Sequence, residues 1–241
     1  MCTKIKLAPH QSLETLRAEY QSHSRVQISD FLESKSAQRI YQSLNSQTQW
    51  NLAWNLNGQH QDMDYTAVNG WTETQKRKLD ELIHQQASYD FQYRYAAVPI
   101  YDIHQKKLLP GHFFNVIYEF LNSQELLVLA RKITGFEQIS FADVQATRFS
   151  KGHFLNEHDD QVIGKNRLAA FVLNLTPKWR SDWGGGLIFP DENEQAVTWF
   201  PKFNMLNIFT VPQKHAVTIV SPFAPESRYS LTGWFRSGPV E

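Results

Sequence analysis

The second half of the chain is broken into short apolar runs, and this pattern limits the available folds more than any other feature. After about residue 140, loops carrying Gly, Pro, Asn and Asp separate the runs. Short apolar runs with turn residues between them predict β-strands, and eight at this spacing favour a sandwich or a jelly roll. The expected strands are DVQATRFS, HFLNEH, RLAAFVLNL, GGLIFP, AVTWF, MLNIFTV, AVTIVS and RYSLTGWFR.

Helical patterns dominate the first half of the chain. Ser29 and Asp30 are expected to cap a helix over residues 31–45, because both residue types satisfy the free backbone N–H groups of a first turn. Ser123 is the expected cap between two helices in the region of residues 110–135. The segments QWNLAWNLN and DFQYRYAAVPIYD are rich in aromatic and β-branched residues, which favours extended structure.

No Gly/Ser-rich linker separates the helical half from the β half. The sequence therefore predicts a mainly β fold with packed helices, in one compact domain. Residues 1–140 are expected to form an α-rich N-terminal support region that packs on one sheet. Residues 141–241 are expected to form a core of the double-stranded β-helix, or jelly-roll, type.

Composition argues against several classes of partner. The chain has 24 Lys and Arg against 24 Asp and Glu, so we expect no general attraction to nucleic acid. No stretch approaches the ~18 consecutive apolar residues of a membrane helix, and the N-terminus lacks the apolar core of a signal peptide. The single cysteine, Cys2, fits a reducing compartment. We therefore expect a cytoplasmic protein without a membrane partner, in which His and carboxylate side chains hold any metal.

The sequence His158-Asp159-Asp160 at the end of an expected strand is the sharpest local feature. Residues two apart on a strand point to the same face, so His158 and Asp160 are expected to point together and Asp159 away. One His and one carboxylate are two ligands of the 2-His-1-carboxylate triad that suits non-haem Fe(II). His215, which directly precedes the AVTIVS run in the β half, is the candidate for the third ligand.

The final expected strand begins with Arg228-Tyr229-Ser230. Alternation places Arg228 and Ser230 on one face. A permanently charged guanidinium beside a hydroxyl is what the distal carboxylate of a buried dicarboxylate requires.

The order H-x-D, distal His and R-x-S on eight strands resembles the Fe(II)- and 2-oxoglutarate-dependent dioxygenases, and most closely the prolyl 4-hydroxylase-like branch. The resemblance is continuous from about Asp143 to Ser237. The stretches that carry it are RFSKGHFLNEHDD, RLAAFVLNLTPKW, GGGLIFP, PKFNMLNIFTVPQKHAVTIV and RYSLTGWFRS.

The resemblance implies that His158, Asp160 and His215 bind Fe(II). It also implies that 2-oxoglutarate and O₂ are used, with ascorbate as a supporting reductant. The reaction would hydroxylate a C–H bond and release succinate and CO₂.

The resemblance also implies a cosubstrate pocket in which Arg228 binds the C5 carboxylate of 2-oxoglutarate, with Ser230 as a second contact. Trp234, on the same face of the strand, would wall this pocket. The chain departs from the family at Phe149 and Val172, where relatives carry Tyr, and both changes remove a hydroxyl group.

Arg148, Phe149 and Val172 are the residues expected at the substrate pocket. By resemblance, the favoured substrate is a prolyl residue in a protein or peptide. Three alternatives stay open: the same chemistry on a free amino acid or small metabolite, a cupin-type metal enzyme that does not use 2-oxoglutarate, and a binding module without catalysis.

Overall fold

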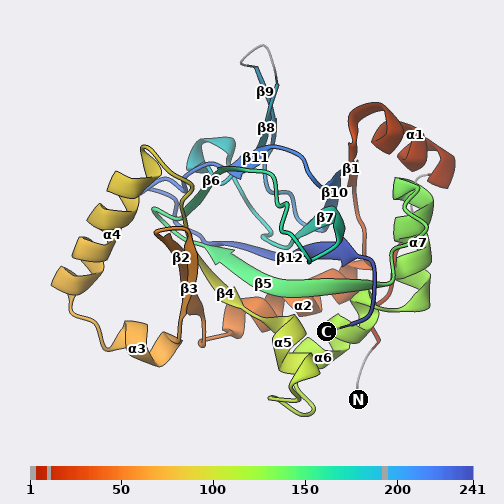
Figure 1. The fold of residues 1–241 in the computed structure, drawn as a ribbon. Helices are drawn as coiled ribbons and strands as arrows, with labels where there is room; N and C mark the ends of the chain where they lie inside the picture. The colour runs from red at the N-terminus through yellow and green to blue at the C-terminus, as the bar shows by residue number, and fades with distance from the viewer. Residues whose placement is uncertain (1–3, 10–11, 192–194, 241) are drawn as a thin grey trace.

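The structure is a computed structural model that describes residues 4–9, 12–191 and 195–240, so Cys2 lies outside the described residues. Within these ranges, twelve strands form one antiparallel sheet that curls into a half-barrel (Figure 1). All eight predicted strands are present, which confirms the jelly-roll prediction. They are β5 (Phe141–Phe149), β6 (Phe154–His158), β7 (Arg167–Asn174), β8 (Leu187–Pro190), β9 (Ala196–Trp199), β10 (Met205–Thr210), β11 (His215–Val217) and β12 (Arg228–Arg236).

The N-terminal region also contributes strands to this sheet. They are β1 (Arg25–Ile28), β2 (Asn51–Leu56), β3 (Gln59–Met63) and β4 (Tyr93–Val98). The strands β2 and β4 fall in the two segments predicted to be extended. The sequence pattern missed β1 because it has only four residues, and β3 because its residues QHQDM are polar. Strand β4 pairs with both β5 and β6, so the N-terminal region completes the barrel wall.

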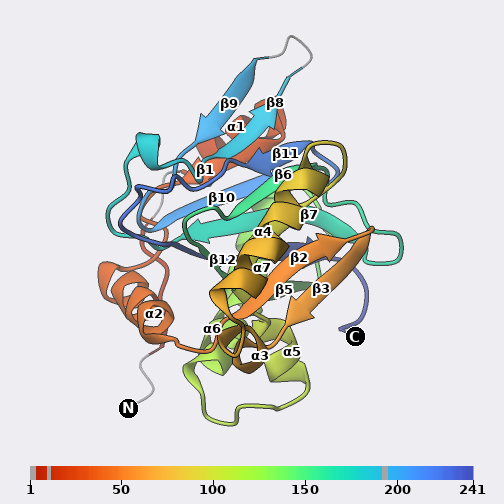
Figure 2. The same ribbon diagram turned by 90° about the vertical axis from the view of Figure 1, so that its left-hand side faces the viewer.

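The sheet folds over on itself to enclose an apolar interior. The order of hydrogen-bonded strands across the sheet is β1-β10-β7-β12-β5-β4-β6-β11-β8-β9. The β8–β9 hairpin projects from the body of the protein (Figure 2). Phe149 and Val172 from one layer and Leu187 and Val217 from the other belong to one buried cluster inside the fold. Alternation along β12 sends Arg228 into the same interior.

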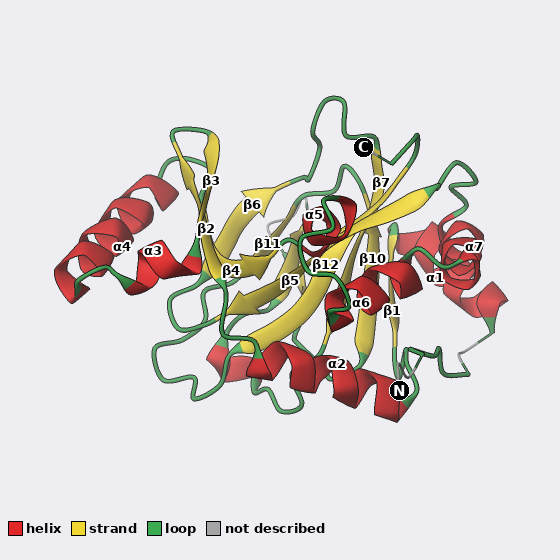
Figure 3. Ribbon diagram, turned by 90° about the horizontal axis from the view of Figure 1, so that it is seen from below, coloured by secondary structure: helices red, strands yellow, loops and turns green. Residues whose placement is uncertain are grey.

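Helices cover the outer face of the sheet. In Figure 3, α2, α5 and α6 lie across β5 and β12. Ile40 of α2 and Ile117 of α6 are fully buried in one cluster with Val144 and Leu231 of the sheet. Burying one such side chain contributes about 1.5–3 kcal/mol. The helices are α1 (Leu13–His23), α2 (Ser34–Ser46), α3 (Tyr65–Asn69), α4 (Glu73–Ala87), α5 (Ile100–Gln105), α6 (Phe113–Leu121), α7 (Gln124–Thr134) and the 3₁₀ turn Ser181–Trp183.

One predicted helix start is confirmed and one is wrong. Ser123 caps α7 by accepting a hydrogen bond from the backbone N–H of Leu126. Helix α2, in contrast, begins at Ser34 rather than after Asp30. The backbone N–H of Phe31 instead donates to the carbonyl of Asn204, and burial of Phe31 holds this segment outside the helix.

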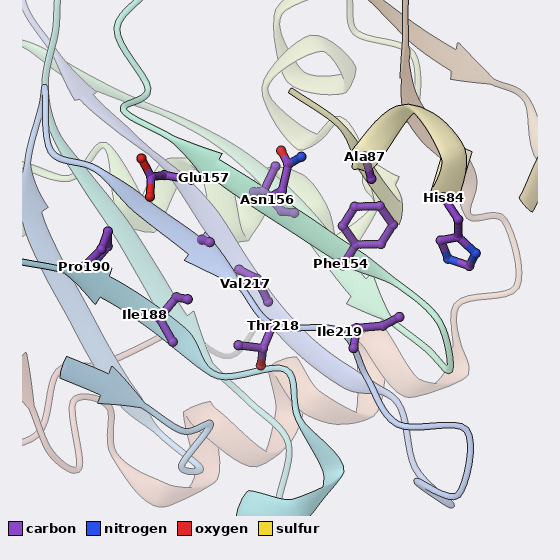
Figure 4. A pocket seen from close by; sticks show the side chains of 12 residues that line it. His84, Ala87, Phe154, Asn156, Glu157, Ile188, Pro190, Val217, Thr218 and Ile219 are labelled. Atoms are coloured by element: carbon purple, nitrogen blue, oxygen red, sulfur yellow. The ribbon is translucent and has the colours of Figure 1, made fainter. Parts of the chain in front are cut away.

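An open apolar groove of about 440 Å³ lies on the outer surface of β6, β11 and β8 (Figure 4). Phe154, Ile188 and Ile219 line it, and His84 and Ala87 of α4 form its flank. None of the predicted site residues lines this groove. Among the described residues, no helix has the length and hydrophobicity to cross a bilayer.

His153, in the turn before β6, makes the stability of the fold depend on pH. The side chain is buried, and its Nδ1 lies 3.3 Å from the carbonyl oxygen of Arg148. Burial, reinforced by the positive charges of Arg94 and Arg148, lowers the pKa of His153 from 6.5 to about 3.

We expect the free energy of unfolding to fall as the pH drops below 6.5, because the unfolded chain then binds a proton at His153 that the folded chain excludes. The His153 component is complete above pH 6.5 and decreases by about 1.4 kcal/mol per pH unit, or about 2 kcal/mol by about pH 5. His153→Gln should remove this component. Urea unfolding across this pH range measures it, and an unchanged pH dependence in the variant would contradict the assignment.

Candidate metal and cosubstrate site

The pairing of β6 with β11 brings two histidines together. His158 is the last residue of β6, His215 is the first of β11, and the two are direct cross-strand partners. Their ring centroids lie 4.1 Å apart. The two residues are 57 positions apart in sequence (215 − 158), so the antiparallel register alone creates this contact.

Asp160 lies beside the two histidines, but strand alternation, which the sequence analysis invoked, is not what places it there. Strand β6 ends at His158, and Asp160 has a left-handed backbone with φ of 65°. The tight turn, rather than strand alternation, returns its carboxylate to the histidines. Its Oδ1 lies 3.2 Å from His158 Nε2, and its Oδ2 lies 3.4 Å from His215 Nε2. Asp159 is exposed, and its carboxylate accepts a hydrogen bond from the backbone N–H of Gln161.

The three side chains fit a divalent transition metal. One ligand atom from each of His158, Asp160 and His215 lies within 4.8 Å of the others. Two imidazole nitrogens and one carboxylate oxygen are the donor set of the facial triad, which leaves coordination positions open.

Backbone carbonyls hold both rings in the required orientation. His158 Nδ1 lies 3.0 Å from the carbonyl oxygen of Asn156, and His215 Nδ1 lies 2.7 Å from that of Gln213. In the tautomer that binds a metal, the proton on each Nδ1 donates to the carbonyl, and Nε2 would be the ligand atom.

The electrostatics favour a neutral imidazole beside an ionised carboxylate. Burial acts to raise the pKa of Asp160, but the hydrogen bond with His158 and the charge interaction with His215 outweigh it and leave that pKa below its ordinary value. Burial lowers the pKa of His215. Both directions favour the protonation states that bind a metal.

Arg228 lies in the same cavity as the triad and lacks a full set of partners. Its side chain is buried, and its Nε and Nη1 groups make no hydrogen bond within the described residues. Only Nη2 has a partner, the Oδ1 of Asn174 at 3.4 Å. Burial lowers the pKa of Arg228 to about 10, so the guanidinium stays charged at neutral pH. A buried cation with unpaired donors requires an anion.

Ser230 and Trp234 follow Arg228 on the same face of β12, and all three line the cavity. Ser230 is fully buried, and its hydroxyl lies 2.8 Å from the hydroxyl of Thr147 on β5. The Arg167 guanidinium stacks 3.5 Å over the Trp234 ring. The Nη1 of Arg167 also donates to the backbone carbonyl of Asp160 at 2.9 Å.

The three residues predicted at the substrate pocket have different positions. Phe149 and Val172 line the interior cavity, whose volume is about 580 Å³. The prediction for Arg148 has to be corrected, because alternation along β5 places it on the opposite face. Its guanidinium there lies 5.1 Å from the Trp50 ring.

Sequence reasoning missed several cavity residues. Thr147 shares the inner face of β5 with Phe149, two positions away, so strand alternation was the signal that could have found it. Tyr95 comes from β4 and stacks on Phe149 with ring centroids 5.2 Å apart. Arg167 follows Asp160 by seven positions across a loop. No periodicity predicts the last two contacts.

Part of the chain is similar to a known protein family. Residues 144–236 match the family model of the 2OG-Fe(II) oxygenase superfamily. This region contains the three ligand candidates and Arg228, so the part of the chain that forms the site is similar to this superfamily.

One curated protein is similar in sequence to part of this chain. Prolyl 3-hydroxylase OGFOD1 of Mus musculus is 30% identical over 111 residues, which is 43% of this chain and 20% of that protein. The chain therefore matches about a fifth of that relative's length.

Two solved structures share the fold. The Pseudomonas putida prolyl-4-hydroxylase has a TM-score of 0.60 at 16% identity, covering 95% of this chain and all of that one. A Trichoplax adhaerens prolyl hydroxylase, solved with a hypoxia inducible factor peptide fragment, has a TM-score of 0.61 at 18% identity, covering 93% and 89% of the two chains.

Asp160→Ala should lower Fe(II) affinity by at least about a hundredfold, because it removes the anionic ligand, a larger loss than that of an outer-shell partner. Asp159→Ala is the matched control and should bind Fe(II) as wild type does, because its carboxylate faces solvent. Anaerobic calorimetric titration with Fe(II) measures both. Equal affinities, or the reverse order, would show that Asp160 is not a ligand.

Proposed function

We propose that this protein is an Fe(II)- and 2-oxoglutarate-dependent dioxygenase that hydroxylates a prolyl residue in a protein or peptide. The observation that carries the proposal is the pairing, in one cavity, of a His-Asp-His group with a buried arginine that has two unpaired donors. The first is a ligand set for iron, and the second is an anchor for the distal carboxylate of a dicarboxylate.

In this proposal, each group of residues in the site has a defined role. His158, Asp160 and His215 would hold Fe(II) on one side and leave the remaining positions for cosubstrate and oxygen. Bound iron with 2-oxoglutarate and O₂ supplies the oxidation that converts C–H to C–OH, with release of succinate and CO₂. Arg228 fixes the far end of the cosubstrate, and the apolar wall around Phe149 and Val172 excludes water.

The cavity surface supports a prolyl side chain as substrate. The rings of Phe91, Tyr93 and Tyr95 line the cavity on the side of His158, with Phe91 5.3 Å from the His158 ring. Flat aromatic faces offer a large contact area to a small apolar ring. The names of the similar proteins, which include prolyl hydroxylases, support the same substrate class.

The surroundings of the cavity favour a prolyl residue within a polypeptide over a free amino acid. Val162 and Phe91 line the cavity and are also exposed, and the next residue after Val162, Ile163, is fully exposed. Exposed apolar side chains grouped beside a cavity indicate contact with a partner molecule. A free amino acid is too small to cover them.

Adding 2-oxoglutarate to the anaerobic Fe(II) protein should produce the weak visible charge-transfer band of a chelated 2-oxo acid. Arg228→Ala should raise the 2-oxoglutarate concentration for half-maximal band intensity by about a hundredfold or more, because the distal carboxylate loses its buried partner. Fe(II) affinity should change little in this variant. Iron binding without a band in wild type would favour a metal enzyme that does not use 2-oxoglutarate.

A proline-containing peptide should stimulate succinate release and gain the mass of one oxygen atom, whereas free L-proline should do neither. The assay contains Fe(II), 2-oxoglutarate and ascorbate, and mass spectrometry of a peptide library locates the modified residue. The same library with proline replaced by alanine is the control. Turnover of free proline but not of peptides would assign the enzyme to small-molecule substrates.

A further inference from the structure

The buried hydroxyl of Thr147 has no task in the function proposed above. Thr147 lies on β5 directly opposite Ser230 of β12, and both side chains line the interior cavity. Thr147 is 2% exposed and Ser230 is 0% exposed, so bulk water does not hydrogen-bond to either hydroxyl. The neighbouring pair in the same register, Phe149 opposite Arg228, contributes no hydroxyl.

The hydroxyls of Thr147 and Ser230 share a hydrogen bond that can run in either direction. The two oxygens are 2.8 Å apart, so one hydroxyl donates to the other. The Thr147 hydroxyl also lies 3.5 Å from the backbone carbonyl of Ser230, to which it can only donate. Either hydroxyl can donate in the 2.8 Å contact, and the carbonyl is a second acceptor for Thr147. When an anion beside Arg228 accepts the Ser230 proton, Thr147 is left to donate its own proton to the Ser230 oxygen.

We infer that Thr147 is a positioning residue for cosubstrate binding, which orients the Ser230 hydroxyl to donate to the distal carboxylate held by Arg228. This inference rests on the proposed use of 2-oxoglutarate. Thr147 donates to Ser230, and Ser230 donates to the carboxylate, so the anion receives a neutral donor beside the guanidinium. A chain of hydroxyls polarises each member and strengthens the last bond.

A double-mutant cycle on cosubstrate affinity tests this chain of donors. Affinity is read from the anaerobic visible band of the Fe(II) protein during titration with 2-oxoglutarate. Ser230→Ala should weaken binding about tenfold, the value of one hydrogen bond to a charged group. Thr147→Val should weaken it roughly threefold, because the Ser230 hydroxyl loses its orienting donor. The double variant should match Ser230→Ala alone, whereas independent effects would give about thirtyfold.

Two controls separate positioning from structural damage. Thr147→Ser keeps the hydroxyl and should bind 2-oxoglutarate as wild type does. Thr134→Val removes another buried threonine hydroxyl, on α7 and outside the cavity, and should also leave affinity unchanged. Thr147→Ala is the second deletion variant if the valine form does not fold.

The choice of ligand adds a readout that a structural role would not move. In 2-oxopentanoate a methyl group replaces the distal carboxylate, so its binding should be the same in wild type and Thr147→Val. If both ligands lose affinity equally, or if the double variant is additive, Thr147 does not act through Ser230 and only this inference fails. If wild-type protein binds Fe(II) but gives no band with 2-oxoglutarate, the proposed function fails and this inference falls with it.

Discussion

The antiparallel register between β6 and β11 is the constraint on which the site depends. It places His158 opposite His215, and the turn after β6 brings the Asp160 carboxylate to the Nε2 atoms of both rings. A shift of one residue would turn one ring to the other face of the sheet. Backbone carbonyls then fix the rings, so the protein prepares the ligand group before any metal binds.

The buried charge of Arg228 is the second feature on which the site depends. The fold supplies only part of the hydrogen-bonding partners that this charge requires. Arg228 is enclosed by the two layers of the barrel and keeps two unpaired donors. Removing such a group from water is costly unless an anion replaces the lost hydration. The arrangement is therefore a binding site by its energetics as well as by its shape. The hydroxyl pair of Thr147 and Ser230 adds a donor that carries no charge of its own.

The N-terminal region also contributes side chains to the cavity. Strand β4 bridges β5 and β6 and contributes Tyr93 and Tyr95 to the cavity, while helices α2, α5 and α6 cover the outer face of the same sheet. The polar strand β3 lacks the alternation of a half-buried strand, and β1 alternates over only four residues, so periodicity could not reveal either strand. The start of α2 was mispredicted because the tertiary contact of Phe31 with Asn204 overrides the local capping signal.

The eight core strands and the shared face of Arg228, Ser230 and Trp234 could be predicted from the sequence, because period-2 alternation is a local property. The candidate ligands could be recognised from their residue types and order, but which distant residues meet depends on the tertiary structure. The left-handed turn at Asp160 and the entry of Tyr95 and Arg167 into the cavity depend on register and sheet curvature. These follow from the packing of the whole sheet, which no single segment encodes.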